Sequence, residues 1–333
     1  MITLLLLGFT LLVFGFARLL VRSDWAARAP AWGIWVWQTT SVSAAISLVL
    51  AGVVVAVPAT PLRDEFAALL RSCSHALAEH YEAPGGLAAA TVGLTVSVAI
   101  AMRFGLLTVN ELRIARRRRT GQRQALALVG VTDPRGFDVV EHNVALVYCL
   151  PGRSNTVVVT RGAMNTLSSH QLDLVLAHER RHLRVRHHLA LSLAAALSRT
   201  FYGVGVFGLA HQQIGALAEM QADDAVRHIS DRQDLARALV ALSPMPVGPA
   251  LGASGSAPRQ RCEAAARIER LSRSTVPMRR PRFVFAATLG ALVLAAPVAL
   301  ALSPAVEGTC CSTPVASSTS AHGQGFGEHP SKP

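Results

Sequence analysis

Lysine, and charge in general, are scarce in this 333-residue chain. Lys332 is its one lysine, and charged residues make up 16% of the sequence, against about 25% in an average soluble domain. Hydrophobic residues make up 51%, and the mean hydropathy is +0.37. A composition this apolar excludes an ordinary soluble enzyme.

Cysteine is also rare, and its spacing is uninformative. The five cysteines contain no C-x-x-C pair, which argues against a cysteine metal site or a disulfide framework; they are Cys73, Cys149, Cys262, Cys310 and Cys311.

Four apolar stretches are long enough to cross a bilayer, which takes about 20 helical residues. They predict transmembrane helices at about 2–21, 34–58, 84–107 and 283–306. The first stretch has an alternative reading as a cleaved signal peptide. Because no basic residue precedes it, we expect a retained span instead.

Arginine supplies the net charge of +12 and predicts a topology. Six arginines lie between Arg113 and Arg123, directly after the third span, and RRPR at 279–282 precedes the fourth. The positive-inside rule then places the region between these spans in the cytoplasm and both termini outside. A nucleic-acid-binding arm is the alternative. A topology anchor explains the charge more simply, so we expect a bilayer and no nucleic acid as partner.

These features predict a mainly α integral membrane protein with one cytoplasmic α+β domain. We expect a membrane region at 1–110, the cytoplasmic domain at 111–282, the fourth span at 283–306 and a disordered outer tail at 307–333. The tail is rich in Ser, Thr, Gly and Pro, a composition that cannot build a core.

The cytoplasmic region begins with β-rich segments and continues as a helix. Phe137–Leu150 and Thr156–Thr160 are β-branched runs separated by PGRSN, which predicts a hairpin. Ser168 precedes Gln171 by three residues, the spacing of a capping box that starts a helix.

That helix carries an H-E-x-x-H motif within the stretch LDLVLAHERRHLRVRHH. His178 and His182 are four residues apart, so both imidazoles lie on one helix face, where they can bind one metal ion. Glu179 lies beside them, where its carboxylate can take a proton from a water molecule. The alternative is a basic surface helix, and we expect His187 and His188 to lie on the surface.

A catalytic zinc usually has three protein ligands and one open position. Downstream, Glu219 and Asp223 are again four residues apart. Glu219 would complete the metal site, and Asp223 would accept the N–H of a ligand histidine, His178 in the first place.

The segment between the two motifs, Leu189–Ala210, is apolar apart from Arg199. If it crossed the bilayer, Glu219 and His178 would lie on opposite sides of the membrane. We therefore expect a buried helix-turn-helix element there. Four arginines keep the motif helix itself out of lipid, which disfavours an intramembrane protease; they are Arg180, Arg181, Arg184 and Arg186.

The stretches VYCLPGRSNTVVVTRGAMNTLSSHQLDLVLAHERRHLRVRHHL, ALAEMQADDAV and RCEAAARIERL resemble a known family. This is the membrane-anchored zinc peptidases of the beta-lactam-sensor signal-transducer type (BlaR/MecR-like), especially short actinobacterial members without the sensor domain. The resemblance covers roughly residues 147–271 and the arrangement of spans. The motifs separate it less well from the CAAX prenyl protease and HtpX-like families.

The resemblance implies a gluzincin-type domain with a small β-sheet and Zn²⁺ as cofactor. It implies that His178, His182 and Glu219 bind the zinc, that Glu179 is the general base, and that the substrate pairs with a sheet edge. Sensors of this family inactivate a cytoplasmic transcriptional repressor. The antibiotic sensors carry an S-x-x-K nucleophile, and no S-x-x-K occurs in this chain, so covalent beta-lactam sensing is excluded.

We expect a membrane zinc metalloendopeptidase that cleaves a cytoplasmic protein in signal transduction. A quality-control or CAAX-type protease is one alternative, and a non-enzymatic membrane sensor or scaffold with a vestigial zinc site is another. An oxyanion donor is also required. Tyr202, His211 and His228 are candidates, although each of them has a simpler structural reading.

Overall fold

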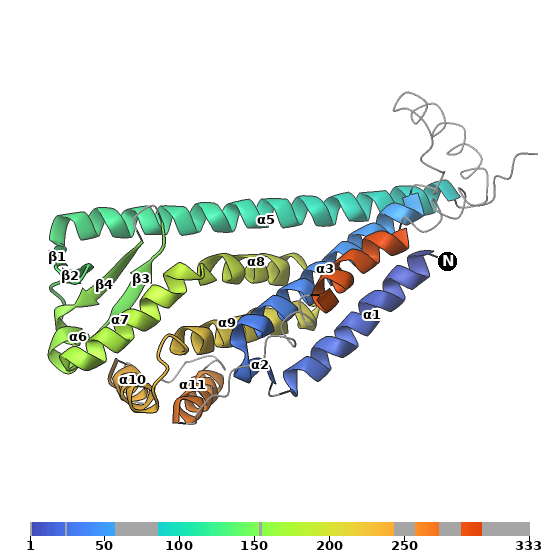
Figure 1. The fold of residues 1–333 in the computed structure, drawn as a ribbon. Helices are drawn as coiled ribbons and strands as arrows, with labels where there is room; N and C mark the ends of the chain where they lie inside the picture. The colour runs from blue at the N-terminus through green and yellow to red at the C-terminus, as the bar shows by residue number, and fades with distance from the viewer. Residues whose placement is uncertain are drawn as a thin grey trace, which may run out of the picture.

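The computed structural model describes residues 2–23, 25–56, 86–152, 155–242, 257–272 and 288–301. Long helices form one end of the molecule, and a small sheet with its covering helices forms the other (Figure 1). The predicted tail at 307–333 lies outside the described residues.

In the described part of the chain, three helices are long and apolar enough to cross a membrane. They are α1 (Ile2–Val21), α3 (Pro30–Ala56) and α5 (Gly86–Val129), with the short α2 (Trp25–Arg28) between the first two. They coincide with the first three predicted spans. Of the fourth, predicted at 283–306, the described residues contain a shorter apolar helix, Thr288–Ala301.

Helix α5 continues far beyond the predicted end of its span at residue 107. It has 44 residues, about 66 Å at 1.5 Å per residue, more than twice the hydrocarbon thickness of a bilayer. Arginine is a good helix former, so the arginine-rich segment extends the helix instead of ending it. Residue 111, where the sequence predicted the second domain to begin, therefore lies inside α5.

Helices α3 and α5 approach each other through small residues. Ser97 donates a hydrogen bond to the Val49 carbonyl oxygen at 3.0 Å. A Cβ atom built on Gly93 would lie 2.7 Å from the backbone oxygen of Gly52. Such close backbone contact between membrane helices requires glycine at the crossing point.

Strands β1 (Val131–Asp133), β2 (Phe137–Val140), β3 (Val147–Leu150) and β4 (Thr156–Thr160) form one mixed sheet in the order β1-β2-β4-β3. The β3–β4 hairpin was predicted and is confirmed, with Val147 opposite Val159. The run 137–150, read as one β segment, is two strands. The first, β2, pairs with β4 in parallel, so the chain must cross over between β2 and β3.

Helices α6 (Arg161–Thr166) and α7 (Ser169–Arg184) follow the sheet. The predicted capping box is present at the start of α7, with Ser168 and Gln171 each bonding the other's backbone N–H. The buried face of α7 packs on the sheet; the shared core includes Phe137, Val157, Val159, Leu172, Val175 and Leu176. This packing fixes the direction in which α7 presents its remaining faces.

Helices α8 (His187–Thr200) and α9 (Gly205–Asp223) form the predicted helix-turn-helix element, which returns to the side from which it started. The hairpin packs among the membrane helices, and Leu197, Phe201 and Phe207 share a core with Val13 of α1 and Ala44 of α3. Val13 lies eight residues before the end of α1, so the hairpin reaches about 12 Å along that helix. It therefore ties the soluble part to the bundle.

Polar contacts from α5 hold the tip of this hairpin. Arg103 donates to the carbonyl oxygens of Thr200 and Arg199 at 3.1 and 3.0 Å. These carbonyls belong to the last turn of α8, where a cation is favoured by the helix dipole. Arg199 forms an ion pair with Glu111 of α5. One helix thus caps and neutralises the end of the other.

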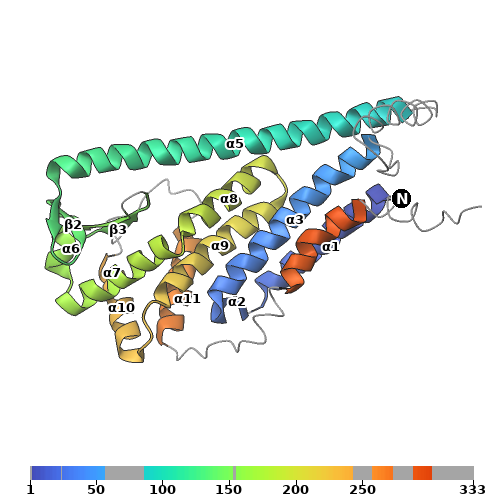
Figure 2. The ribbon, with the colours of Figure 1, turned by 45° about the horizontal axis from the view of Figure 1, so that its top comes forward.

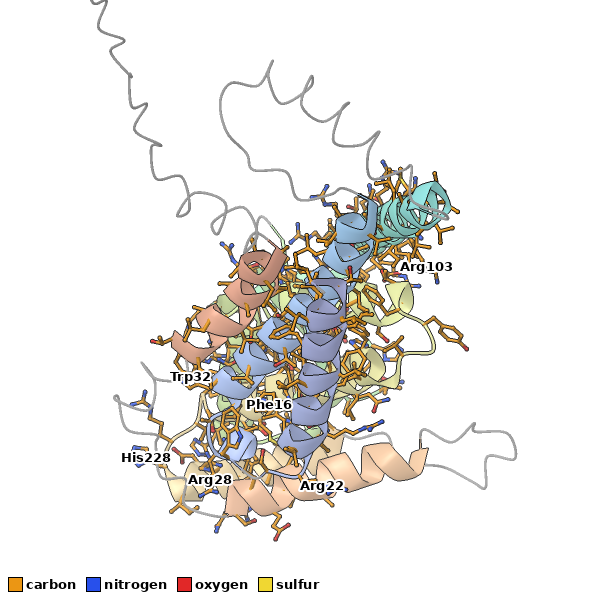
Figure 3. The ribbon with its side chains drawn as sticks, turned by 90° about the vertical axis from the view of Figure 1, so that its right-hand side faces the viewer. Phe16, Arg22, Arg28, Trp32, Arg103 and His228 are labelled. Carbon is orange, nitrogen blue, oxygen red and sulfur yellow. The ribbon has the colours of Figure 1, made fainter. Side chains whose placement is uncertain are left out.

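Helices α10 (Ile229–Leu242) and α11 (Ala257–Ser272) cover the end of α9 (Figure 2). Arg22 and Arg28 lie at the end of the membrane helices that faces α11 (Figure 3). The arginines between the first two spans therefore lie on the same side as the sheet and its helices.

We predict that Gly93→Ala destabilises the protein, whereas Gly105→Ala, on the same helix, does not. The alanine methyl group at position 105 meets nothing within 4 Å, but at position 93 it meets the backbone of Gly52. Overpacking costs about 1–3 kcal/mol, which exceeds the roughly 1 kcal/mol gained in helix propensity. Unfolding midpoints in detergent measure the difference, and equal midpoints would contradict close contact between α3 and α5.

Candidate metal centre

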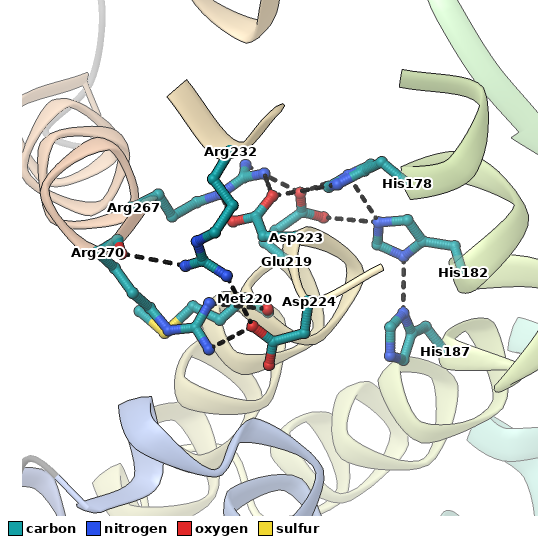
Figure 4. Close-up of polar contacts among 10 residues, drawn as sticks. All are labelled: His178, His182, His187, Glu219, Met220, Asp223, Asp224, Arg232, Arg267 and Arg270. Carbon is teal, nitrogen blue, oxygen red and sulfur yellow. Dashed lines mark hydrogen bonds and ion pairs between the residues drawn. The ribbon is translucent and has the colours of Figure 1, made fainter. Parts of the chain in front are cut away.

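Two helices bring three possible metal ligands together at one point. Helix α7 supplies His178 and His182, and helix α9 supplies Glu219 (Figure 4). Their ligand atoms all lie within 4.8 Å of one another. His178 is buried, while the other two side chains are partly accessible, so a substrate can approach the group from one side.

The spacing of these atoms fits a tetrahedral metal. The two Nε2 atoms are 3.2 Å apart, and carboxylate oxygens of Glu219 lie 3.7 Å from Nε2 of His178 and 3.6 Å from Nε2 of His182. Zinc bonds to nitrogen and oxygen of about 2.0–2.2 Å in a tetrahedron separate the ligand atoms by about 3.3–3.5 Å. The donor set therefore suits zinc with a fourth position left open.

Asp223 lies directly behind His178. Its Oδ1 is 3.1 Å from Nδ1 of His178, and its side chain is fully buried. The ring N–H is not aimed straight at this oxygen, so the contact is an ion-pair contact rather than an aligned hydrogen bond. The carboxylate still favours a proton on Nδ1, which leaves Nε2 free to face the group.

Arg267 of α11 neutralises both acidic side chains of α9. It donates to the two oxygens of Asp223 at 3.1 and 2.8 Å and lies 2.9 Å from Oε2 of Glu219. A fork of this geometry matches a carboxylate well. The arginine thus orients Glu219 as well as balancing its charge.

Neighbouring contacts hold α11 in place. Arg270 bonds Asp224 at 2.7 Å, the Met220 carbonyl oxygen at 3.1 Å and the Ala27 carbonyl oxygen at 2.8 Å. The buried Arg232 of α10 donates to the Arg270 carbonyl oxygen at 3.1 Å. The contact with Ala27 joins this network to the short helix between the first two membrane helices.

The buried charges shift the pKa values of the ligands. Burial disfavours the charged form of His178, but Asp223 and Glu219 outweigh it and raise its pKa to about 9. Burial likewise opposes the charge of Glu219, yet His178 and Arg267 lower its pKa to about 2. Burial lowers the pKa of His182 to about 4, so this imidazole is neutral at pH 7.

Glu179 lies beside the ligands and in contact with strand β3. Burial raises its pKa, the direction that suits a base working near neutral pH. Cys149 of β3 lies close enough to Glu179 for the two groups to shift each other's pKa. Burial, together with the nearby carboxylate, raises the pKa of the Cys149 thiol to about 12.

The prediction that His187 lies on the surface is wrong. Its side chain is 3% exposed; Nδ1 lies 2.8 Å from Nδ1 of His182, and Nε2 lies 2.9 Å from Oε1 of Gln221. Position 187 is five residues after His182, which is off the shared face of a straight helix. The chain turns between α7 and α8, and this turn brings the two rings together. His188, by contrast, is partly exposed.

The three candidate oxyanion donors are spread out. Tyr202 is 89% exposed at the turn between α8 and α9, and His228 is exposed just before α10. His211 lies on α9 eight residues before Glu219, about 12 Å along the helix. Within the described residues, no hydrogen bond or ion pair links any of them to the His178–His182–Glu219 group.

Sequence reasoning missed Arg267, Cys149 and the contact of His187. A signal existed for the arginine, because Arg267 and Arg270 are three residues apart and share one face of α11. For Cys149 and His187 no local pattern was available, since their partners come from other elements or depend on a turn with no Gly or Pro.

Comparison with known proteins agrees with this geometry. The model of Peptidase family M48 matches residues 111–269, a range that contains every residue of the centre. No curated protein and no solved structure matches the chain. The fold and the ligand set define a zinc-dependent peptidase. The chain is therefore a zinc metallopeptidase with candidate membrane helices, and its residues 111–269 are similar to peptidase family M48.

We predict that zinc binding to the metal-free protein releases close to one proton at pH 7.5. His178 is protonated below its pKa of about 9, and a histidine must be neutral to bind metal. The part of this release that comes from His178 should therefore fall towards zero as the pH rises through 9, which leaves only the proton lost by water bound to the metal. Calorimetry in buffers of different ionisation enthalpy counts the protons. In Asp223→Asn the carboxylate that raises this pKa is gone, so fewer protons should be released.

Proposed function

We propose that the protein is a zinc metalloendopeptidase in which His178, His182 and Glu219 hold the metal and Glu179 is the general base. The convergence of two histidines from α7 and one carboxylate from α9 at tetrahedral spacing carries this proposal. Zinc bound there would polarise the scissile carbonyl group and acidify a water molecule.

Glu179 would perform the proton transfers. Its carboxylate would take a proton from the attacking water and donate it to the amine that leaves. Burial keeps its pKa raised, which makes the carboxylate a better proton acceptor. Asp223 and Arg267 are positioning residues in this scheme, because they contact the ligands and not the reacting atoms.

Strand β3 would bind the substrate. It is an edge strand of the sheet, and the edge of a sheet pairs readily with an extended peptide. Thr160 donates to the Leu146 carbonyl oxygen at 3.0 Å, so the alternation of an antiparallel pair turns the backbone groups of Val147 and Cys149 away from β4. A peptide paired there would pass beside Glu179.

The cellular role that we propose is signal transduction of the BlaR/MecR-like kind, with the peptidase domain in the cytoplasm. Arg22 and Arg28 lie on the peptidase side of the membrane helices (Figure 3), and positive loops favour the cytoplasmic side. The substrate on that side would be a soluble protein such as a transcriptional repressor. No S-x-x-K motif occurs in this sequence, so the proposal includes no covalent capture of a beta-lactam.

We predict about one zinc per chain in the wild type and in Glu179→Gln, and loss of zinc in Glu219→Ala. Glu179→Gln should lower hydrolysis of casein, an unstructured protein probe, by about 10²–10⁴-fold, because the proton acceptor is gone. Asp173→Asn is the matched control, since this carboxylate is exposed on the same helix. A folded wild type without zinc would favour the scaffold hypothesis, whereas full activity in Glu179→Gln would contradict the role of Glu179 as general base.

The substrate class is tested in cells that express either the wild type or Glu179→Gln. We expect one DNA-binding repressor to be cut in wild-type cells and to co-purify uncut with the variant. Asp173→Asn cells serve as the control and should match the wild type. Degradation of many misfolded membrane proteins would instead indicate a quality-control protease, and cleavage confined to prenylated C-termini would indicate a CAAX-type protease.

A further inference from the structure

His187 is a buried histidine that contacts the candidate ligand His182 but does not belong to the group of candidate ligands. His187 is 3% exposed, yet both of its ring nitrogens have a polar partner. Nδ1 lies 2.8 Å from Nδ1 of His182, and Nε2 lies 2.9 Å from the side-chain oxygen of Gln221 on α9. The ring of His187 therefore bridges helix α7, which carries His182, and helix α9, which carries Gln221. Figure 4 shows its contact with His182.

If His182 binds metal, the ring protons of His182 and His187 can be arranged in only one way. Nε2 of His182 faces the other ligands, so Nε2 must be unprotonated and the ring proton must be on Nδ1. That Nδ1–H needs an acceptor, which is Nδ1 of His187. The proton of His187 is then on Nε2, and the oxygen of Gln221 accepts it.

The reverse arrangement would disable the ligand. If the amide nitrogen of Gln221 faced His187, its proton would occupy the space in front of Nε2, and His187 would have to carry its own proton on Nδ1. His187 would then donate to His182 and place the proton of that ring on Nε2, where the metal must bind. Gln221 thus sets the direction of hydrogen-bond donation from His182 through His187.

The turn between α7 and α8 shows that the backbone is shaped for this contact. Arg186 has φ 56° and ψ 44°, and it is the one non-glycine residue with positive φ among the described residues. Such a conformation is unfavourable for an arginine and persists only where the surrounding structure enforces it. It reverses the chain one residue before His187 and so directs that ring back towards His182.

We propose that His187 is a positioning residue that selects the metal-binding tautomer of His182, with Gln221 as the group that fixes the tautomer of His187. This inference rests on the zinc site proposed above. It adds a second support to that site, since His178 has Asp223 behind it, whereas Nδ1 of His182 faces His187 and no carboxylate of the described residues. The metal would be held by two histidines that are oriented independently of each other.

Substitutions at position 187 separate hydrogen bonding from packing. The amide oxygen of His187→Asn occupies the place of Nδ1 and keeps the acceptor, whereas His187→Leu fills similar space without one. His188→Leu is the matched control, because this neighbouring histidine is partly exposed and has no role in the proposed chain. Thermal unfolding of the metal-free proteins confirms that each variant folds.

The readouts are zinc affinity by chelator competition and the visible absorption spectrum of the cobalt-substituted protein. Loss of a hydrogen-bond partner behind a metal ligand typically weakens binding by about 10–100-fold. We expect that loss, with a shifted cobalt band, in His187→Leu. His187→Asn and His188→Leu should stay within about threefold of the wild type. Gln221→Glu, which keeps the acceptor, should bind zinc more tightly than Gln221→Met.

Two results would overturn the inference while leaving the zinc site intact. One is wild-type affinity and an unshifted cobalt band in folded His187→Leu. The other is an equal loss in His187→Asn and His187→Leu, which would mean that the ring acts by packing alone. Absence of zinc from the folded wild type is a different result, because it would remove the metal site itself.

Discussion

The carboxylates in the last turns of α9 are the constraint on which the rest of the site depends. Asp223 is fully buried as α9 packs against its neighbours, while the side chains of Glu219 and Asp224 are 42% and 31% exposed. A buried charge is tolerated only when it is paired and hydrogen-bonded. The partners come from two directions, the histidines of α7 on one side and the arginines of α11 on the other. Three helices far apart in sequence are thereby fixed around one point.

The hairpin formed by α8 and α9 connects the site to the candidate membrane helices. One end of α9 carries the ligand Glu219, while the other end packs among α1, α3 and α5. Leu217, two residues before the ligand, lies where a Cβ on Gly33 of α3 would come within 2.8 Å. A displacement of the membrane helices would therefore reach the metal-binding carboxylate through directly packed side chains, which gives the proposed signalling role a physical route.

The residues behind the candidate ligands and those in front of them have different roles. Behind the ligands lie groups that set charge and orientation, namely the buried Asp223 and His187 and the partly exposed Arg267. In front lies Glu179 with strand β3, where Cys149 occupies the hydrogen-bonding position of the free sheet edge. The metal would then be held by groups that do not move during turnover, while the open side receives the peptide.

The sequence by itself determined the features that repeat at short range. Helical spacing placed His178 with His182 and Glu219 with Asp223, the capping box set the start of α7, and uncharged length predicted the three spans that the described residues contain. It also required that the apolar segment between the motifs turn back. The match of residues 111–269 to a peptidase family agrees with the chemistry read from these patterns.

Only the tertiary structure decided which groups support the ligands. From the sequence, His187 is predicted to be a surface residue. Its contact with His182 depends on the left-handed backbone conformation of Arg186, and no glycine or proline at this turn indicates that conformation. Cys149 meets Glu179 because β3 joins the sheet beside α7, and Arg267 meets Asp223 because α11 packs across the end of α9. These contacts join elements separated by many residues, and local periodicity carries no information about them. The burial of charge selects such partners, and burial exists only once the helices have packed.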